Sequence, residues 1–477
     1  MKMYIDGKWT DASDGNVLQV FNPATGQMVD TVPEATREDL DRALDCAVEG
    51  QAEWSAFPLH RKAEILERYA CLVTEATEKI AALMCEEGGK PLAQCRTEVE
   101  ANAAIFRIYN AAAYSFYGKT LPYNAEPRSQ GDVAFTVHEP LGVFANIVPF
   151  NYPVELAAHK LAPMLVTGNS VVLLPSSKTP RSALMLVELL VKAGVPAKAV
   201  SCVTGAGSRV GAWAAADRRV AAVSFTGSTR VGVGLAETCA KSLRRVSLEL
   251  GGNDALIIFG DCDMEQALQE TISGRIGNAG QTCCASKRFL VQRGIYEPFT
   301  LELAKCLEQV KVGNPADPGV EMGPLIREDA AKVVEEQIRR TVAQGGILIC
   351  GGIRRGAFIM PTVLQVSRDT DIARDMEVFG PVFPLIPFET AQEAVDIANQ
   401  TCYGLSSGVM TSDMKTAMKA ANAMKAGACV IGGSGNYRLA HQPFGGYGMS
   451  GIGREGAVCT LEEMTQQKLI SFKGILN

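Results

Sequence analysis

The sequence has no excess of positive charge, no long apolar run, no low-complexity segment and no tandem repeat. Lys and Arg total 46 against 52 for Asp and Glu, and the resulting net charge of −6 disfavours general nucleic-acid binding. No stretch approaches the ~20 apolar residues of a membrane-spanning helix. Residues 1–10 also lack the apolar stretch of a signal peptide. We therefore expect a cytoplasmic protein that contacts neither nucleic acid nor a membrane.

Metal-binding cysteine motifs are also missing, although the chain has 14 cysteines. No CxxC pair and no Cys/His ligand spacing is present, so we expect no metal site. In a long chain without a signal peptide, cysteines are typically reduced and buried. A functional role for any one of them must therefore be argued from its neighbours in the sequence.

The length and the apolar pattern indicate a large α/β protein. A chain of 477 residues with 47% hydrophobic and 21% charged residues exceeds what one hydrophobic core usually serves. Residues 36–118 follow the 3.6-residue period of helices, whereas 141–250 alternate short apolar strands with helical stretches. Buried parallel strands are expected at 143–148, 170–174, 200–203 and 220–225, with a helix over 180–193. This pattern predicts a doubly wound sheet, the usual host of a dinucleotide.

A second α/β region is expected from residue 251 to about 445. Its candidate strands lie at 255–259, 288–291 and 428–431. Two further segments, 123–140 and 459–477, are short, alternating and partly polar. They indicate exposed strands, which need a partner or a cover because their edges carry unpaired hydrogen-bonding groups.

One carboxylate and one thiol each follow an apolar run at a glycine-marked bend. Glu249 lies in residues 248–253 (LELGGN), and Cys283 ends residues 280–283 (GQTC). A thiol beside a carboxylate base suits an enzyme that captures an aldehyde covalently and then hydrolyses the thioester. The alternatives are a buried cysteine at a strand end, which is our expectation for Cys284, and a solvated carboxylate.

Two further motifs complete a resemblance to a known family. Asn151 lies between prolines in residues 149–153 (PFNYP), and Glu377 opens residues 377–381 (EVFGP). Together with the carboxylate and the thiol, these motifs make the chain similar to the NAD(P)-dependent aldehyde dehydrogenase superfamily over essentially its whole length. Its lactaldehyde-dehydrogenase-like branch is the most similar.

The resemblance implies an α/β fold in three parts. A Rossmann-like doubly wound cofactor-binding domain would comprise residues 1–122 and 141–250, and an α/β catalytic domain residues 251–445. Residues 123–140 and 446–477 would form a small β element that joins subunits. The implied assembly is a homo-oligomer, either a dimer or a homotetramer.

By the same resemblance, three residues carry the chemistry. Cys283 is the nucleophile, which reacts only as a thiolate. Glu249 activates the deacylating water, a role that suits a carboxylate whose pKa is raised by a partly apolar site. The side-chain amide of Asn151 joins the backbone N–H of Cys283 in holding the oxyanion. Taken alone, an asparagine in a proline-rich loop is equally well explained as a turn former.

The signals for the cofactor are individually weaker. Residues 225–232 (FTGSTRVG) follow an expected strand and open a helix, so their N–H groups can face a pyrophosphate, although such helix starts are common without a ligand. The resemblance implies that Glu377 grips the nicotinamide ribose hydroxyls and that Phe379 packs near the nicotinamide. The full expected NAD(P)-binding set is Ile147, Val148, Pro149, Phe150, Leu174, Ser176, Ser177, Lys178, Phe225, Gly227, Ser228, Gly232, Leu250, Glu377 and Phe379.

One segment departs from the family pattern. In residues 174–180 (LPSSKTP), Leu174 replaces the lysine expected at the adenosine ribose, and Ser177 replaces the glutamate of NAD-preferring members. Loss of that glutamate removes a group that repels a 2′-phosphate. Loss of the lysine weakens binding of either cofactor, and Lys178 is the candidate to compensate. We therefore expect NAD(P), leaning to NADP.

Arg107, His159 and Arg438 are the candidates for substrate recognition. Two arginines and an imidazole suit an anionic tail, and the resembling branch includes enzymes for small aldehydes with phosphonate, sulfonate or hydroxyl groups. The alternative is a pair of structural arginines and a core histidine. Gly277 stands where succinate-semialdehyde enzymes place an arginine, which argues against succinate semialdehyde.

The expected reaction is oxidation of a small, polar or anionic aldehyde to its carboxylate with NAD(P)+. It would pass through a thiohemiacetal and a thioester on Cys283, followed by hydrolysis. Two alternatives stay open. One is a CoA-acylating dehydrogenase, which the presence of Glu249 disfavours. The other is a non-catalytic binding or structural protein that kept the fold.

Overall fold

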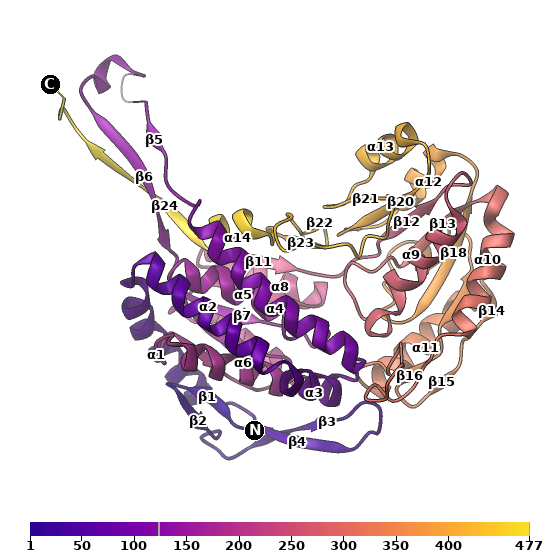
Figure 1. The fold of residues 1–477 in the computed structure, drawn as a ribbon, viewed down its shortest axis with the longest axis horizontal. Helices are drawn as coiled ribbons and strands as arrows, with labels where there is room; N and C mark the ends of the chain where they lie inside the picture. Colours follow the sequence, from indigo (N-terminus) through magenta and orange to yellow (C-terminus); the bar gives the residue numbers. More distant parts are fainter. Residues whose placement is uncertain (123–124, 477) are drawn as a thin grey trace.

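The structure is a computed structural model that describes residues 1–122 and 125–476. Residues 123 and 124 of the expected segment 123–140, and Asn477 of the expected tail, lie outside the described residues. The described chain forms two α/β lobes and an arm that projects from the first lobe (Figure 1).

The first lobe is built on an eight-stranded sheet in the order β2-β1-β9-β8-β7-β10-β11-β23. Its five central strands are parallel, which confirms the predicted doubly wound sheet. They are β9 (Val200–Cys202), β8 (Ser170–Leu174), β7 (Val143–Ile147), β10 (Val220–Thr226) and β11 (Arg245–Glu249). The antiparallel edge strands are β1 (Met3–Ile5), β2 (Lys8–Thr10) and β23 (Gly451–Ile452). Because strand order reverses between β7 and β10, a ligand crevice is expected at their carboxyl ends.

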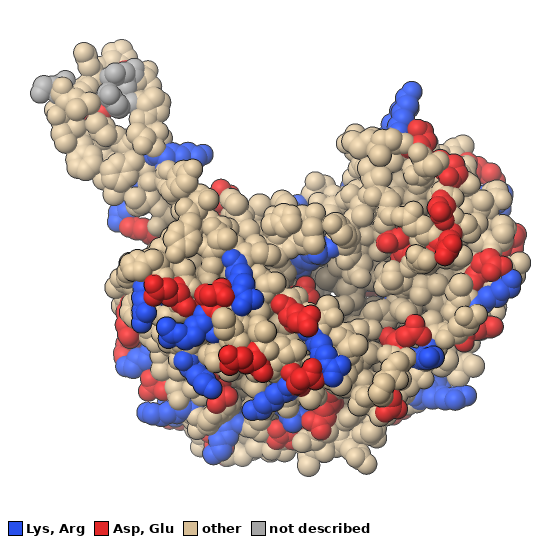
Figure 2. Space-filling view, viewed as in Figure 1, with Lys and Arg blue, Asp and Glu red and all other residues tan. Residues whose placement is uncertain are grey.

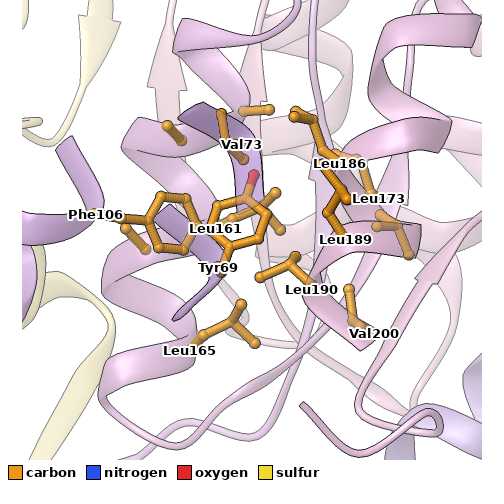
Figure 3. Packing of buried hydrophobic residues seen from close by; sticks show 14 of the residues in the cluster. Tyr69, Val73, Phe106, Leu161, Leu165, Leu173, Leu186, Leu189, Leu190 and Val200 are labelled. Atoms are coloured by element: carbon orange, nitrogen blue, oxygen red, sulfur yellow. The ribbon is translucent and has the colours of Figure 1, made fainter. Parts of the chain in front are cut away.

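Helices cover both faces of this sheet because its strands are apolar on both sides. Successive residues point to opposite faces, so Phe144 of β7 joins one core and Ala145 the other. The first core lies under α2–α6, where Tyr69 of α2 packs against Phe106 of α4 with ring centroids 4.4 Å apart (Figure 3). The helices are α1 (Arg37–Ser55), α2 (Leu59–Glu75), α3 (Thr77–Gly88), α4 (Leu92–Ala113), α5 (Glu155–Val166), α6 (Pro180–Ala193), α7 (Gly207–Ala216) and α8 (Thr229–Ala240).

The second lobe contains a seven-stranded sheet in the order β14-β17-β18-β13-β12-β20-β21, in which only the β14–β17 pair is antiparallel. The strands are β14 (Ile347–Cys350), β17 (Thr362–Gln365), β18 (Val382–Phe388), β13 (Arg288–Gln292), β12 (Ala255–Ile258), β20 (Ser407–Met410) and β21 (Val430–Ile431). The helices are α9 (Met264–Ile276), α10 (Arg293–Glu308), α11 (Glu328–Ala343), α12 (Ala391–Ala398) and α13 (Met414–Ala423). This confirms the expected second α/β region.

The arm is an antiparallel sheet of β24 (Thr465–Phe472), β6 (Val133–Pro140) and β5 (Thr120–Leu121). The observed limits differ from the expected ones at both ends. β5 falls in the segment expected to belong to the cofactor domain. Of residues 446–477, only the last part joins the arm, because β23 pairs with β11 and α14 (Ala457–Glu463) buries Leu461 against the first lobe.

Short antiparallel strand pairs complete the described chain. They are β3 (Val17–Phe21) with β4 (Met28–Pro33), β15 (Arg354–Arg355) with β16 (Phe358–Ile359), and β19 (Tyr403–Gly404) with β22 (Tyr447–Gly448). The 3₁₀ turns are η1 (Pro127–Ser129), η2 (Gly277–Gly280) and η3 (Asp371–Ala373). Among the described helices, none combines the length and the apolar character that crossing a membrane requires.

Candidate active site

The loop that carries Cys283 begins with three consecutive residues in the left-handed region. Asn278, Ala279 and Gly280 have φ angles of 48°, 53° and 77°. Left-handed backbone costs a residue with a side chain about 1–2 kcal/mol, so such a run persists only where surrounding contacts enforce it. A Cβ on Gly280 would lie 2.3 Å from the carbonyl oxygen of Gly380, which leaves room for glycine alone.

Side-chain amides hold this loop in place. Asn278 Nδ2 donates to the carbonyl of Asn151 at 2.8 Å, and Asn151 Nδ2 donates to the carbonyl of Gln281 at 2.9 Å. The Gln281 side chain donates to the Asn278 carbonyl and accepts from the N–H of Ile326. Asn151 is thereby fixed beside the loop with its second N–H free for another acceptor.

Cys283 lies half-buried at the end of this loop. Within the described part of the chain, its backbone N–H has no acceptor. A hydrogen bond with the Cys284 thiol and burial together raise the pKa of Cys283, while the charges of Lys287 and Arg438 oppose them. The thiol is therefore protonated at rest and needs a base or further positive charge to react.

Glu249 ends β11 and is 3% exposed. Its Oε2 is buried and has no hydrogen-bond partner among the described residues. Burial, reinforced by the charge of Glu455, raises the pKa of Glu249 well above its ordinary value, and Arg438 opposes this. The charges of Glu249 and Cys283 also interact. A carboxylate of this kind can accept a proton near neutral pH.

A buried ionic cluster lies behind Glu249, and sequence reasoning missed two of its members. Glu455 accepts from Lys160 Nζ at 2.8 Å and from Arg438 at 2.7 Å. Burial raises the pKa of Glu455, but the two cations outweigh it and hold that pKa well below its ordinary value. Lys160 and Glu455 are 295 positions apart, so no local sequence signal links them.

A cavity of about 290 Å³ opens at the carboxyl ends of β7, β10 and β11. It brings together nine residues of the expected set: Pro149, Phe150, Asn151, Gly227, Ser228, Leu250, Cys283, Glu377 and Phe379. Thr226 and Gly251 also line it and were not expected. The space-filling view shows the molecule hollowed between the two lobes (Figure 2).

The remaining expected cofactor residues lie outside this cavity. Ile147, Val148, Leu174 and Phe225 are buried in the cores of the first lobe. Ser176, Ser177 and Lys178 occupy the loop from β8 to α6, where the charges of Lys178 and Arg327 interact. Gly232 lies in α8, and a Cβ there would come within 2.4 Å of Leu250.

Two of the three expected substrate residues belong to the buried charge cluster beside Glu249, although neither lines the cavity itself. Arg438 stacks on Phe444 at 4.0 Å, and its buried Nε has no partner in the described part of the chain. His159 of α5 is 2% exposed, and its Nδ1 has no partner. Burial and the charge of Arg438 lower the pKa of His159 well below its ordinary value, so the imidazole is neutral.

Arg107 does not belong to this group, which corrects the sequence-based expectation. It lies on the outer surface of α4, where its Nε pairs with Glu67 of α2 at 2.9 Å. Its side chain is 45% exposed, and it does not line the cavity. The helical period that buries Phe106 and Tyr109 turns this position away from the core.

The site fits a dinucleotide on several counts. α8 starts at Thr229 without a side-chain cap, so the N–H groups of its first turn are available to a pyrophosphate. Phe150 and Phe379 meet edge to face at 6.2 Å and form an apolar wall. Glu377 is held over the glycine turn by the N–H of Gly252 at 3.2 Å.

Comparison with known proteins decides which family this site belongs to. The aldehyde dehydrogenase family profile matches residues 9–470. The chain belongs to this family. It is 37% identical to 3-sulfolactaldehyde dehydrogenase of Priestia aryabhattai over 98% of this chain and 97% of that protein. It is 36% identical to the NADP(+) succinate-semialdehyde dehydrogenase GabD of Escherichia coli strain K12, over 97% and 96%.

A solved structure agrees with this assignment. The crystal structure of an aldehyde dehydrogenase from Brucella melitensis biovar abortus 2308 superposes with a TM-score of 0.95 at 36% identity, covering 99% of this chain and 97% of the other. The protein is an NAD(P)-dependent aldehyde dehydrogenase that oxidises its aldehyde to a carboxylate.

Proposed function

We propose that this enzyme oxidises a small aldehyde that carries an anionic group, with Arg438 as the main contact to that group. The observation that carries the proposal is the buried Nε–H of Arg438, which has no acceptor among the described residues although Nη2 of the same guanidinium pairs with Glu455. A buried donor left unpaired costs about 1–3 kcal/mol, and an anionic oxygen would satisfy it. His159 lies in the same cluster, and its neutral ring offers a further hydrogen bond.

The relatives support this substrate class. Their names specify aldehydes with a sulfonate group, in 3-sulfolactaldehyde, and with a carboxylate group, in succinate semialdehyde. Both substrates are short, and both carry their anionic group apart from the aldehyde carbon. A single buried arginine near Cys283 suits such a substrate, since a charge-assisted hydrogen bond is stronger than a neutral one.

In this mechanism Cys283 attacks the aldehyde carbon, and its thiol proton passes to a nearby base. The free N–H of Cys283 and the second N–H of Asn151 Nδ2 stabilise the oxyanion of the thiohemiacetal. NAD(P)+, held by Gly227, Ser228 and Glu377 at the cavity, would supply the hydride acceptor that the change from thiohemiacetal to thioester on Cys283 requires. Glu249 then takes a proton from water, and the resulting hydroxide displaces the thiolate. Buried Glu249 beside Cys283 supports water rather than CoA as the acyl acceptor.

The residues proposed to hold the cofactor fall into three groups. The first turn of α8, with Gly227 and Ser228, would face the pyrophosphate. Glu377 would bind the nicotinamide ribose, with Phe150 and Phe379 against the ring. The third group would pack against the residues that line the cofactor cavity and set its shape. It comprises Ile147, Val148, Leu174, Phe225, Gly232 and Leu250.

A preference for NADP is part of the proposal. Ser177 and Ser176 leave no carboxylate in the loop after β8, and Lys178 brings a cation there. The charge of Arg327 interacts with that of Lys178, although Asp329 partly neutralises Arg327 through an ion pair at 2.7 Å. Two cations with hydroxyls beside them suit a 2′-phosphate.

The enzyme is also proposed to act as a cytoplasmic homo-oligomer, a dimer or a homotetramer, that joins through the arm. β24 pairs with β6 on one side only, and Leu469 and Phe472 are 58% and 44% exposed. On the face shown in Figure 2, the arm carries few charged side chains. An unpaired strand with apolar side chains needs a partner, and a second copy would supply one.

The test of the substrate class is a panel of short aldehydes, anionic and neutral, each assayed with NAD+ and NADP+. We expect the anionic aldehydes to show the higher kcat/KM. Arg438→Met should lower kcat/KM about 10- to 100-fold for these substrates and much less for neutral ones. Arg107→Met is the matched control, since Arg107 lies on the outer surface. A preference for neutral aldehydes, or equal effects of both variants, would refute the proposal.

A further inference from the structure

A lysine is buried directly beneath the nucleophile. Lys287 is 1% exposed and lies four residues after Cys283, just before β13. Its Nζ donates to the carbonyl oxygen of Cys283 and to that of Ala285 at 3.3 Å. The same Nζ lies 3.6 Å from Oε1 of Glu377. The ammonium group therefore joins the backbone of the nucleophile loop to a carboxylate that lines the cavity.

This arrangement matches a charged lysine. An ammonium group has three N–H donors, and three oxygen atoms surround it here. Burying an ammonium is costly unless its donors are satisfied and a counter-charge is near. Glu377 is one counter-charge. The charge of Asp254 also interacts with that of Lys287, although burial raises the pKa of Asp254 to about 7, and the backbone N–H of Lys287 donates to the Asp254 carbonyl at 2.8 Å.

Two other buried cations of the second lobe provide a contrast. Arg275 and Arg288 hydrogen-bond only to backbone carbonyls and so fasten loops and strands together. Neither donates to the nucleophile or to a cavity side chain. Lys287 donates to the backbone carbonyl of Cys283 and forms an ion pair with the cavity residue Glu377, which separates it from a purely structural cation. Sequence reasoning missed it because lysine is expected at the surface. The Lys-Arg pair that enters the apolar strand β13 was the available signal.

We propose that Lys287 is a positioning residue that links the Cys283 loop to Glu377 and promotes ionisation of the Cys283 thiol. The proposal rests on the proposed roles of Cys283 and Glu377. The hydrogen bond from Lys287 fixes the peptide group between Cys283 and Cys284. The ion pair of Lys287 fixes the carboxylate of Glu377, which would bind the nicotinamide ribose. Its charge favours the thiolate over the thiol, against the effects of burial and of Cys284.

The test measures thiol reactivity in the cofactor-free enzyme. Cys283 is alkylated with iodoacetamide across a range of pH, and modification is followed on its own peptide by mass spectrometry. Lys287→Met should slow alkylation at pH 7 about tenfold and move the profile to higher pH. Lys287→Gln keeps two N–H donors but no charge and should move the profile in the same direction. NAD(P)+ affinity, measured by titration, should fall severalfold in both variants.

Lys62→Met is the matched control, because Lys62 is also buried but donates to Ser55 in the helical layer of the first lobe. A shift in both Lys287 variants and not in this control supports the proposal. Unchanged profiles would overturn it, and so would failure of both Lys287 variants to fold while the control folds. If alkylation of wild-type Cys283 leaves turnover intact, the proposed function itself fails instead.

Discussion

Glu249 and Cys283 both have raised pKa values, and these shifts bear on the chemistry proposed for them. Burial raises the pKa of Glu249, and burial adds to a thiol hydrogen bond in raising that of Cys283. Neither group is ionised at low pH, and each lies near the cation Arg438. The Cys283 thiol therefore holds its proton at rest, and Glu249 has a pKa that lets it accept a proton near neutral pH, as general acid–base catalysis requires.

Replacing Glu249 separates the two halves of the reaction. Glu249→Gln keeps the shape of the side chain but cannot accept a proton from water. We expect one equivalent of reduced cofactor to form in a burst, followed by turnover at least about 100-fold slower than in wild type. Stopped-flow absorbance of the reduced nicotinamide measures both phases. Unchanged steady-state turnover would remove Glu249 from the mechanism.

The pH dependence of deacylation follows from the same residue. Below its pKa, Glu249 is protonated and cannot act as a base, so the rate must rise as pH increases through that pKa. Because the pKa is raised, the rise lies well above the ordinary value of 4.5. Single-turnover hydrolysis of the thioester at a series of pH values measures it. A rate that is constant down to pH 5 would show that another group is the base.

At the scale of elements, the contact between α8 and β11 sets the width of the cavity. Gly232 of α8 faces Leu250, which follows β11 and lines the cavity. Gly232→Ala places a methyl group 2.4 Å from a Leu250 methyl carbon, so Leu250 must move. Overpacking of this kind costs about 1–3 kcal/mol. We expect the KM for NAD(P)+ to rise about fivefold or more.

Gly234→Ala is the control, because a Cβ there meets nothing within 4 Å and the residue lies on the exposed side of α8. It should raise helix stability by about 0.5–1 kcal/mol and leave the KM unchanged. Equal KM values in both variants, measured by initial rates, would mean that Leu250 does not bound the cofactor site.

The elements that sequence reasoning found share one property. β7, β8, β9 and β10 are buried on both faces, and their apolar runs match the structure to within one or two residues. The two-residue strands β5, β22 and β23 were not found, because a pairing partner defines them rather than composition. The arm itself was expected, but its start at β5 was not. Three left-handed residues before Cys283 were also unforeseen, since contacts from distant segments enforce them.

The same distinction applies to the site. The motifs at Asn151, Glu249 and Cys283 predicted residues that the fold brings close together, because each follows a strand end or a marked turn. Sequence reasoning missed Lys160, Glu455 and Lys287, because charged residues are expected at the surface and only the fold shows that these three are buried. Arg107 was misplaced for the opposite reason: its charge suggested a ligand, but its position on α4 faces solvent.

At the scale of the whole molecule, the arm is the proposed contact between subunits. Leu469 of β24 is 58% exposed on a segment that projects from the first lobe (Figure 1). Leu469→Glu places a charge at the proposed contact and should shift the enzyme to smaller species in sedimentation equilibrium. Leu301→Glu, at a 57% exposed position on α10, should not change the mass. A monomeric wild type, or an unchanged mass for Leu469→Glu, would contradict a role of the arm in assembly.

The most direct test of the proposed mechanism is to measure the mass of the Cys283 peptide during turnover. Glu249→Gln enzyme is mixed with NAD(P)+ and a substrate aldehyde, quenched in acid and digested, and the Cys283 peptide is analysed by mass spectrometry. The account predicts an acyl group of the substrate's mass on Cys283, formed only when cofactor is present. Reduction of cofactor with that peptide unmodified, or with the acyl group on Cys284, would contradict it.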